Sequence, residues 1–125
     1  MTKFASTVVV SGNGNGGINK IDNNNLLITN GRGIEIRRIS DGAWVSNFTV
    51  PSYGSHPGSA QYFPGSYSPS MKMDYCLSYD AVAQKGWVNA ISVADPANPV
   101  TAWTYNCTHV SEIQGSGGGM VYVGT

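Results

Sequence analysis

The amino-acid sequence predicts an all-β protein, and three observations support this prediction. No segment carries apolar residues at the i, i+3, i+4, i+7 spacing over a length sufficient for a helix. The chain of 125 residues contains 16 glycines and seven tyrosines and is rich in Asn and Ser, a composition typical of turns and strands rather than surface helices. Short apolar runs alternate with turn signals such as Asn-Gly, Asp-Gly and Asp-Pro.

The expected strands follow one another along the chain between these turn signals. The first lies at Thr7–Val10. It is followed by the segment SGNGNGG at 11–17, which consists of residues that favour turns. A short buried strand at Leu26–Ile28 precedes the hairpin signal Asn30-Gly31. The next strand begins at Ile34, and Asp41-Gly42 turns the chain into the strand at 43–50.

Residues 87–105 carry the clearest turn signal of the hairpins that the sequence predicts. Pro96 fixes its own φ, and Pro99 biases Asn98 towards extended backbone. The Asp95 side chain can accept hydrogen bonds from nearby backbone amides, which holds the bend locally. Two strands joined by a tight turn are therefore expected here.

Two parts of this single all-β domain, about 18–50 and 71–105, resemble each other in both turn residues and apolar positions. A partial third copy is expected at 110–125, and residues 51–70 form a loop insertion rich in Pro, Gly, Ser and Tyr. The alternative is chance matching among valines and isoleucines. The matched pairs are Ile18/Met73, Ile21/Cys76, Leu27/Val82, Ile34/Val88, Asp41/Asp95, Val45/Val100 and Phe48/Trp103.

The stretch VNAISVADPANPVTAWTY resembles the blade motif of LVIVD-type β-propellers, with Asp95-Pro96 and Pro99 at the turn. The stretch GIEIRRISDGAWVSNF is similar to the hairpin of WD- and YVTN-type blades. The resemblance implies propeller-like four-stranded antiparallel repeats and carries over no functional residue. Propellers have 4–8 blades, so about eleven strands would be incomplete in one chain. A longer polypeptide or identical chains would then complete the ring and cover the edges near Thr7–Val10 and Met120–Val123. A β-sandwich or barrel is the alternative.

Charge and hydropathy narrow the classes of partner. Seven basic and seven acidic residues cancel, which disfavours nucleic acid, because phosphate backbones require a clustered basic surplus. The cluster Arg32, Arg37 and Arg38 contains Glu35 and is either a solvated strand face or a phosphate site. No apolar run is long enough for a membrane span. Without a secretion signal, the expected location is the cytoplasm or a virus particle.

The sequence offers little support for catalysis or cofactors. No Gly-x-Ser-x-Gly elbow accompanies the histidines His56 and His109, and the carboxylates are spread along the chain. No cofactor or metal ligand pattern is present. Cys76 and Cys107 are expected to be buried free thiols, or else a single bridge.

The segment 51–70 is the strongest candidate for binding. Long loops are commonly functional, and aromatic residues among Ser and Gly suit protein recognition. The alternative is a lid that packs on the sheet or on a neighbouring subunit. The candidate binding residues are Tyr53, Tyr62, Phe63 and Tyr67.

These observations predict a non-enzymatic structural or protein-interaction module, a component of a larger assembly such as a virion or fibre. Self-association with other protein chains is the expected partnership. A carbohydrate-binding lectin is the alternative, because Trp44, Trp87 and Trp103 recur near equivalent blade positions. An enzyme ranks last.

Overall fold

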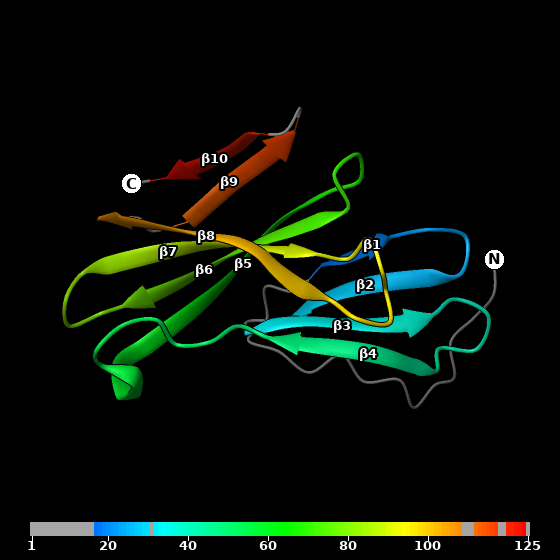
Figure 1. Ribbon diagram of the computed structural model, residues 1–125, viewed down its shortest axis with the longest axis horizontal. Helices are drawn as coiled ribbons and strands as arrows, with labels where there is room; N and C mark the ends of the chain where they lie inside the picture. Colours follow the sequence, from blue (N-terminus) through cyan, green and yellow to red (C-terminus); the bar gives the residue numbers. More distant parts are fainter. Residues whose placement is uncertain (1–16, 31, 109–111, 118–119, 125) are drawn as a thin grey trace.

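The computed structural model describes residues 17–30, 32–108, 112–117 and 120–124, and it confirms the all-β prediction (Figure 1). The predicted strand at Thr7–Val10 lies outside the described residues. One short 3-10 turn, η1 (Pro57–Ser59), is present. The strands are β1 (Ile18–Lys20), β2 (Asn25–Asn30), β3 (Gly33–Arg38), β4 (Trp44–Thr49), β5 (Ala60–Ser68), β6 (Met73–Asp80), β7 (Lys85–Ser92), β8 (Val100–Thr108), β9 (Glu112–Gly117) and β10 (Met120–Gly124).

Two four-stranded antiparallel sheets account for most of the described chain. Strands β1 to β4 form the first sheet and β5 to β8 the second, each in simple sequential order. Strands β9 and β10 pair as a separate hairpin, and β9 lies against β5 and β6. Every neighbouring pair is joined by a short connection, as expected for antiparallel strands.

The two sheets share two local features at matching positions. A register shift lies between Ile36 and Arg37 in β3–β4, and another lies between Ala90 and Ile91 in β7–β8. In the turn that follows, an aspartate accepts a hydrogen bond from the amide of the alanine two residues later. The distances are 3.0 Å from Ala43 N to Asp41 Oδ1 and 3.2 Å from Ala97 N to Asp95 Oδ1.

Some of the predicted equivalences between the two regions are wrong. Leu27 is fully buried within β2, whereas Val82 lies in the β6–β7 turn and is 59% exposed. By register, Leu27 corresponds to Tyr75, because their partners on β3 and β7 are equivalent. Phe48 likewise corresponds to Tyr105, while Trp103 lies two residues away on the same face. The predicted pairs Leu27/Val82 and Phe48/Trp103 are therefore wrong, whereas the turns at Asp41 and Asp95 match.

The predicted loop insertion at 51–70 is also corrected. Residues Ala60–Ser68 form strand β5, which pairs with β6 along its length and shifts register between Pro64 and Ser66. Tyr62, Phe63 and Tyr67 supply the β-forming side chains that outweigh the Pro and Gly content of the segment. Only the connections on either side of β5 are irregular, with η1 in the first of them.

The main core lies between the two sheets. The first sheet turns Leu27, Ile34 and Ile36 inward, and the second supplies Cys76 and Ile91. A second, smaller cluster lies on the other face of the second sheet, on the side away from the first sheet. It consists of Tyr75, Leu77, Val88 and Ala90, with Phe63 and Met73 packed against it.

No helix in the described part of the chain is long and apolar enough to cross a membrane.

Candidate functional site

An apolar stripe is exposed on one face of β8, the edge strand of the second sheet. Val100, Trp103 and Tyr105 are 55%, 41% and 63% exposed. They lie on one face because their partners Ser92, Ala90 and Val88 alternate along β7. We call these three residues the β8 stripe.

The β8 stripe lies next to the smaller buried cluster, on the same face of the second sheet, and forms its exposed margin. The ring of Trp103 lies 5.8 Å from that of Tyr75, measured between centroids, with the planes tilted by 42°. Tyr75 and Val88 are themselves almost fully buried. The face therefore changes from buried to exposed within one strand spacing, which is the pattern of an apolar surface that lacks a partner.

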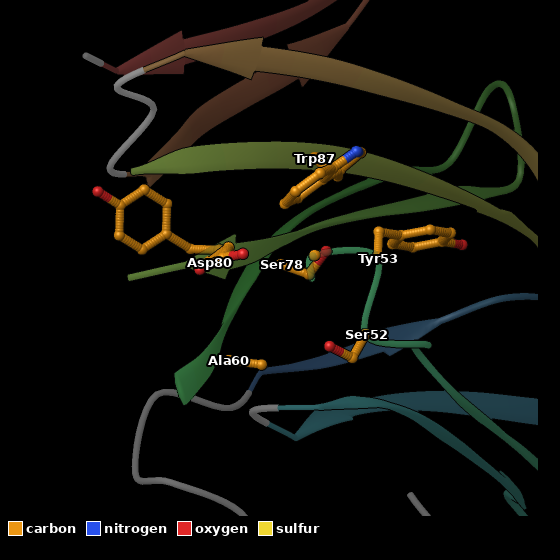
Figure 2. Close-up of a pocket in the computed structure, with 8 residues that line it drawn as sticks. Ser52, Tyr53, Ala60, Ser78, Asp80 and Trp87 are labelled. Carbon is orange, nitrogen blue, oxygen red and sulfur yellow. The ribbon is translucent and has the colours of Figure 1, made fainter. Parts of the chain in front are cut away.

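A hollow lies on the opposite face of the second sheet, beside Tyr53 and Trp87 (Figure 2). The two rings stack with centroids 6.3 Å apart and planes at 30°. The space is too narrow to admit a water molecule, so it offers no room for a ligand. Its lining residues are Ser52, Tyr53, Gly54, Ala60, Ser78, Tyr79, Asp80 and Trp87.

Asp80 closes one side of this hollow and is held by three donors. Its Oδ1 accepts hydrogen bonds from the amides of Val82 and Ala83, both at 3.0 Å, and its Oδ2 lies 2.9 Å from Nδ1 of His56. The Ala83 amide, followed by His56, holds the pKa of Asp80 below its ordinary value. The carboxylate thus fastens the β6–β7 turn and the segment before η1.

The Asp80, His56 and Ser55 arrangement does not form a hydrolytic relay. In such a relay the acid and the nucleophile contact different ring nitrogens of the histidine. Here Ser55 Oγ lies 3.2 Å from Nδ1 of His56, the same nitrogen that contacts Asp80. The geometry therefore favours a structural role for His56, while His109 lies outside the described residues.

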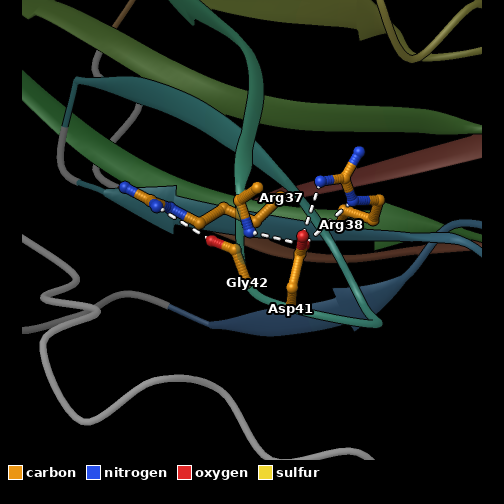
Figure 3. A network of polar contacts seen from close by, with 5 residues as sticks. Arg37, Arg38, Asp41 and Gly42 are labelled. Atoms are coloured by element: carbon orange, nitrogen blue, oxygen red, sulfur yellow. Dashed lines mark hydrogen bonds and ion pairs between the residues drawn. The ribbon is translucent and has the colours of Figure 1, made fainter.

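Two arginines of the basic cluster, Arg37 and Arg38, pair with acidic side chains, and Figure 3 shows Arg38 with Asp41 and Arg37 with the carbonyl of Gly42. Arg37 bonds Glu35 Oε1 through Nε at 3.0 Å and Nη2 at 2.6 Å, and it also donates to the carbonyl of Gly42. Arg38 binds both carboxylate oxygens of Asp41, and this contact, followed by the Ala43 amide, lowers the pKa of Asp41 to about 2. These pairs support the interpretation of this cluster as a strand face rather than a phosphate site.

The four predicted binding residues do not lie on one surface. Tyr53 and Tyr62 pack at the margin of the main core, and Tyr67 is buried within it. Phe63 packs on the smaller cluster, across the sheet from the others. Arg32 covers the ring of Tyr62, with its guanidinium carbon 4.7 Å from the ring centroid. Whether any of the four binds a partner stays a prediction.

Asp74 is a buried carboxylate that the sequence did not single out. It is 1% exposed, and neither of its side-chain oxygens has a hydrogen-bond partner. Burial raises its pKa to about 8. Together, burial and Asp74 raise the pKa of the Cys76 thiol, which is free and inert in the core.

Among the described residues, no group of three or more His, Cys, Asp or Glu side chains could hold a metal ion. Comparison with known proteins found no match to a protein family, a curated protein or a solved structure.

Proposed function

We propose that this chain is a non-enzymatic structural and protein-interaction module of a larger assembly, such as a virion or fibre. The observation that carries the proposal is the β8 stripe. Three large apolar side chains on one face of an edge strand are costly to leave in water unless another surface covers them. A chain with no net charge also lacks the repulsion that keeps molecules apart.

We also propose that the sheets are propeller-type blades. The matching register shifts and the matching Asp-to-Ala turn bonds support this reading. So does the direction of equivalent faces: Ile34 faces the second sheet, and its counterpart Val88 faces away from the first. Stacked repeats point equivalent faces in the same direction. On this proposal, β9 begins a third unit.

Within that architecture the β8 stripe has a clear place. The second sheet covers the inner face of the first, and β9 contacts the second sheet mainly at β5 and β6. The stripe is an exposed part of the second sheet's outer face. A protein surface that packs on the β8 stripe would cover the apolar side chains of β8, as the second sheet covers the inner face of the first sheet.

Selection of phage-displayed peptides on the immobilised full chain tests the proposal. We expect selected peptides to bind the wild type and to lose binding to a variant carrying both Trp103→Lys and Tyr105→Lys. Trp44→Lys is the matched control, because Trp44 is also exposed on an edge strand but belongs to the other sheet. Equal binding to the wild type and the β8 variant, or no selected peptide, would contradict the proposal.

The glycan-binding alternative requires an aromatic ring face that is open to a sugar. The stacked pair Tyr53 and Trp87 offers no such opening, whereas Trp44 at 58% exposure does. A glycan array separates the two functions. A signal that Trp44→Ala abolishes and the double β8 variant retains would favour the lectin.

A further inference from the structure

We propose that β8 pairs edge to edge with β8 of a second copy of this chain, antiparallel and with Thr104 on the two-fold axis. The inference rests on the proposed function, because it takes β8 as the strand through which the chain contacts another protein. It goes further by naming the partner, the pairing mode and the register.

The outer edge of β8 is open to strand addition. β8 ends the order of the second sheet, and no described strand pairs with it on the side away from β7. Alternate residues of an antiparallel strand direct their N–H and C=O groups outward. Residues 101–106 are all exposed, so this row of backbone donors and acceptors is accessible.

β8 also lacks the features that protect edge strands. Its nine residues, VTAWTYNCT, contain no charged side chain and no proline, and charge or proline is how natural edges avoid pairing. The edges β1 and β5 are better protected, while the edge strand β4 also lacks charge and proline but has six residues against the nine of β8. β1 has only three residues, and β5 contains Pro64, shifts register beside it and lies against β9.

The sequence of β8 is self-complementary about Thr104. Antiparallel pairing on that axis places Trp103 opposite the partner's Tyr105, and Tyr105 opposite the partner's Trp103. Both residues lie on the face of the β8 stripe, so the two stripes join into one apolar surface. Cross-strand aromatic pairs stabilise a sheet, and a two-fold axis makes the contact close on itself.

A slip by one residue would lose this arrangement. It would place the two stripes on opposite faces of the joined sheet, since side chains alternate along a strand. The register is therefore specified by the aromatic residues, and the uncharged residues between them place no like charges together.

The test uses the fact that a residue on the axis faces its own copy. Thr104→Lys and Thr104→Glu each place like charges directly opposite each other, which destabilises a strand pair. Thr104 is exposed, and its described side-chain contact is a long one, 3.5 Å from Oγ1 to the Tyr53 hydroxyl. Both variants should keep the wild-type circular dichroism spectrum.

Light scattering and native mass spectrometry on the full chain give the outcome. We expect the wild type at twice 13.2 kDa, and each variant alone at the mass of one chain under the same conditions. An equimolar mixture of the Lys and Glu variants should recover the dimer as a mixed species. Thr49→Lys and Thr49→Glu are the matched controls on the edge strand β4 and should leave the dimer unchanged.

Three results would overturn the inference: a monomeric wild type, a dimer that both Thr104 variants retain, or variants whose mixture stays monomeric. The proposed function fails separately, through the peptide selection. Peptides that bind a monomeric wild type through the β8 stripe would uphold that function and reject self-pairing.

Discussion

Asp74 and Asp80 lie on the same face of β6, near its two ends, and each is 1% exposed. Their pKa values nevertheless move in opposite directions. Asp80 accepts two backbone amides and contacts His56, so its charged form is stabilised. Asp74 has no donor, so burial favours its neutral form. Donors, and not burial alone, decide whether a carboxylate in this sheet is charged.

The comparison also separates two roles. Asp80 lies beside a turn, where free backbone amides are available. Asp74 lies where β5, β6 and β7 pair, opposite Tyr67 and Ile91, and strand amides there already bond to each other. Asp80 therefore stabilises a connection between two strands, whereas a charge on Asp74 would destabilise the core.

The largest expected effect concerns Asp74 and pH. Its pKa is raised in the folded state, so the stability that its neutral form provides is present below about pH 4 and is lost as the pH rises to about 8. Since each unit of pKa shift is about 1.4 kcal/mol, the loss should reach a few kcal/mol. Asp74→Asn should remove this slope, as measured by urea unfolding from pH 4 to 9. Parallel pH curves for the variant and the wild type would refute the assignment.

The contribution of Asp80 to stability should depend on pH in the opposite direction. Asp80→Ala leaves the amides of Val82 and Ala83 without their acceptor, so the urea midpoint at pH 7 should fall. Asp80→Asn is the control, because its amide oxygen can still accept from both. The lowered pKa of Asp80 means that its contribution is lost as the pH falls through that value. The gap between Asp80→Ala and wild type should therefore narrow in acid, and a constant gap would exclude the charge.

Gly54 tests how tightly the Asp80 side chain is held. A Cβ at this position would lie 2.5 Å from Asp80 Oδ2 and 2.7 Å from its Cβ. Gly54→Ala should therefore cost roughly 1–3 kcal/mol, as overpacking does. Gly58→Ala is the matched control, because a Cβ there meets nothing within 4 Å. Adding Asp80→Ala should relieve part of the cost, and calorimetric melting of the four variants measures the coupling.

The sequence predicts what is local in this fold and misses what depends on distant contacts. The turns at Asp41 and Asp95 are correctly placed, because turn chemistry acts over a few residues. β5 is missed, because Pro64 and the glycines suggest a loop although tyrosines of the same segment pack on the sheet. The composition shows the residues that disfavour a strand, whereas pairing with β6 makes the segment a strand.

The candidate site was harder to predict for the same reason. The aromatic residues of 51–70 were predicted to be binding residues of a loop, yet β5 sends Tyr62 and Phe63 to opposite faces. The alternation of these adjacent residues could have indicated this, had the segment been recognised as a strand. The exposure of Trp103 depends on β8 being the edge of the second sheet, and no local pattern shows which strand lies at an edge.

The substitution of His56 should have the smallest effect on stability, and it tests which donor keeps Asp80 charged. Its side chain is 43% exposed, so its contact with Asp80 is screened by water. His56→Ala should cost less than about 1 kcal/mol, since the two backbone amides of the β6–β7 turn still hold the carboxylate. Nuclear magnetic resonance titration of the Asp80 carboxyl carbon provides a second readout. The pKa of Asp80 should rise in His56→Ala yet stay below its ordinary value, because the Ala83 amide is the larger cause of the shift. A return to the ordinary value would instead make His56 the group that keeps this carboxylate charged.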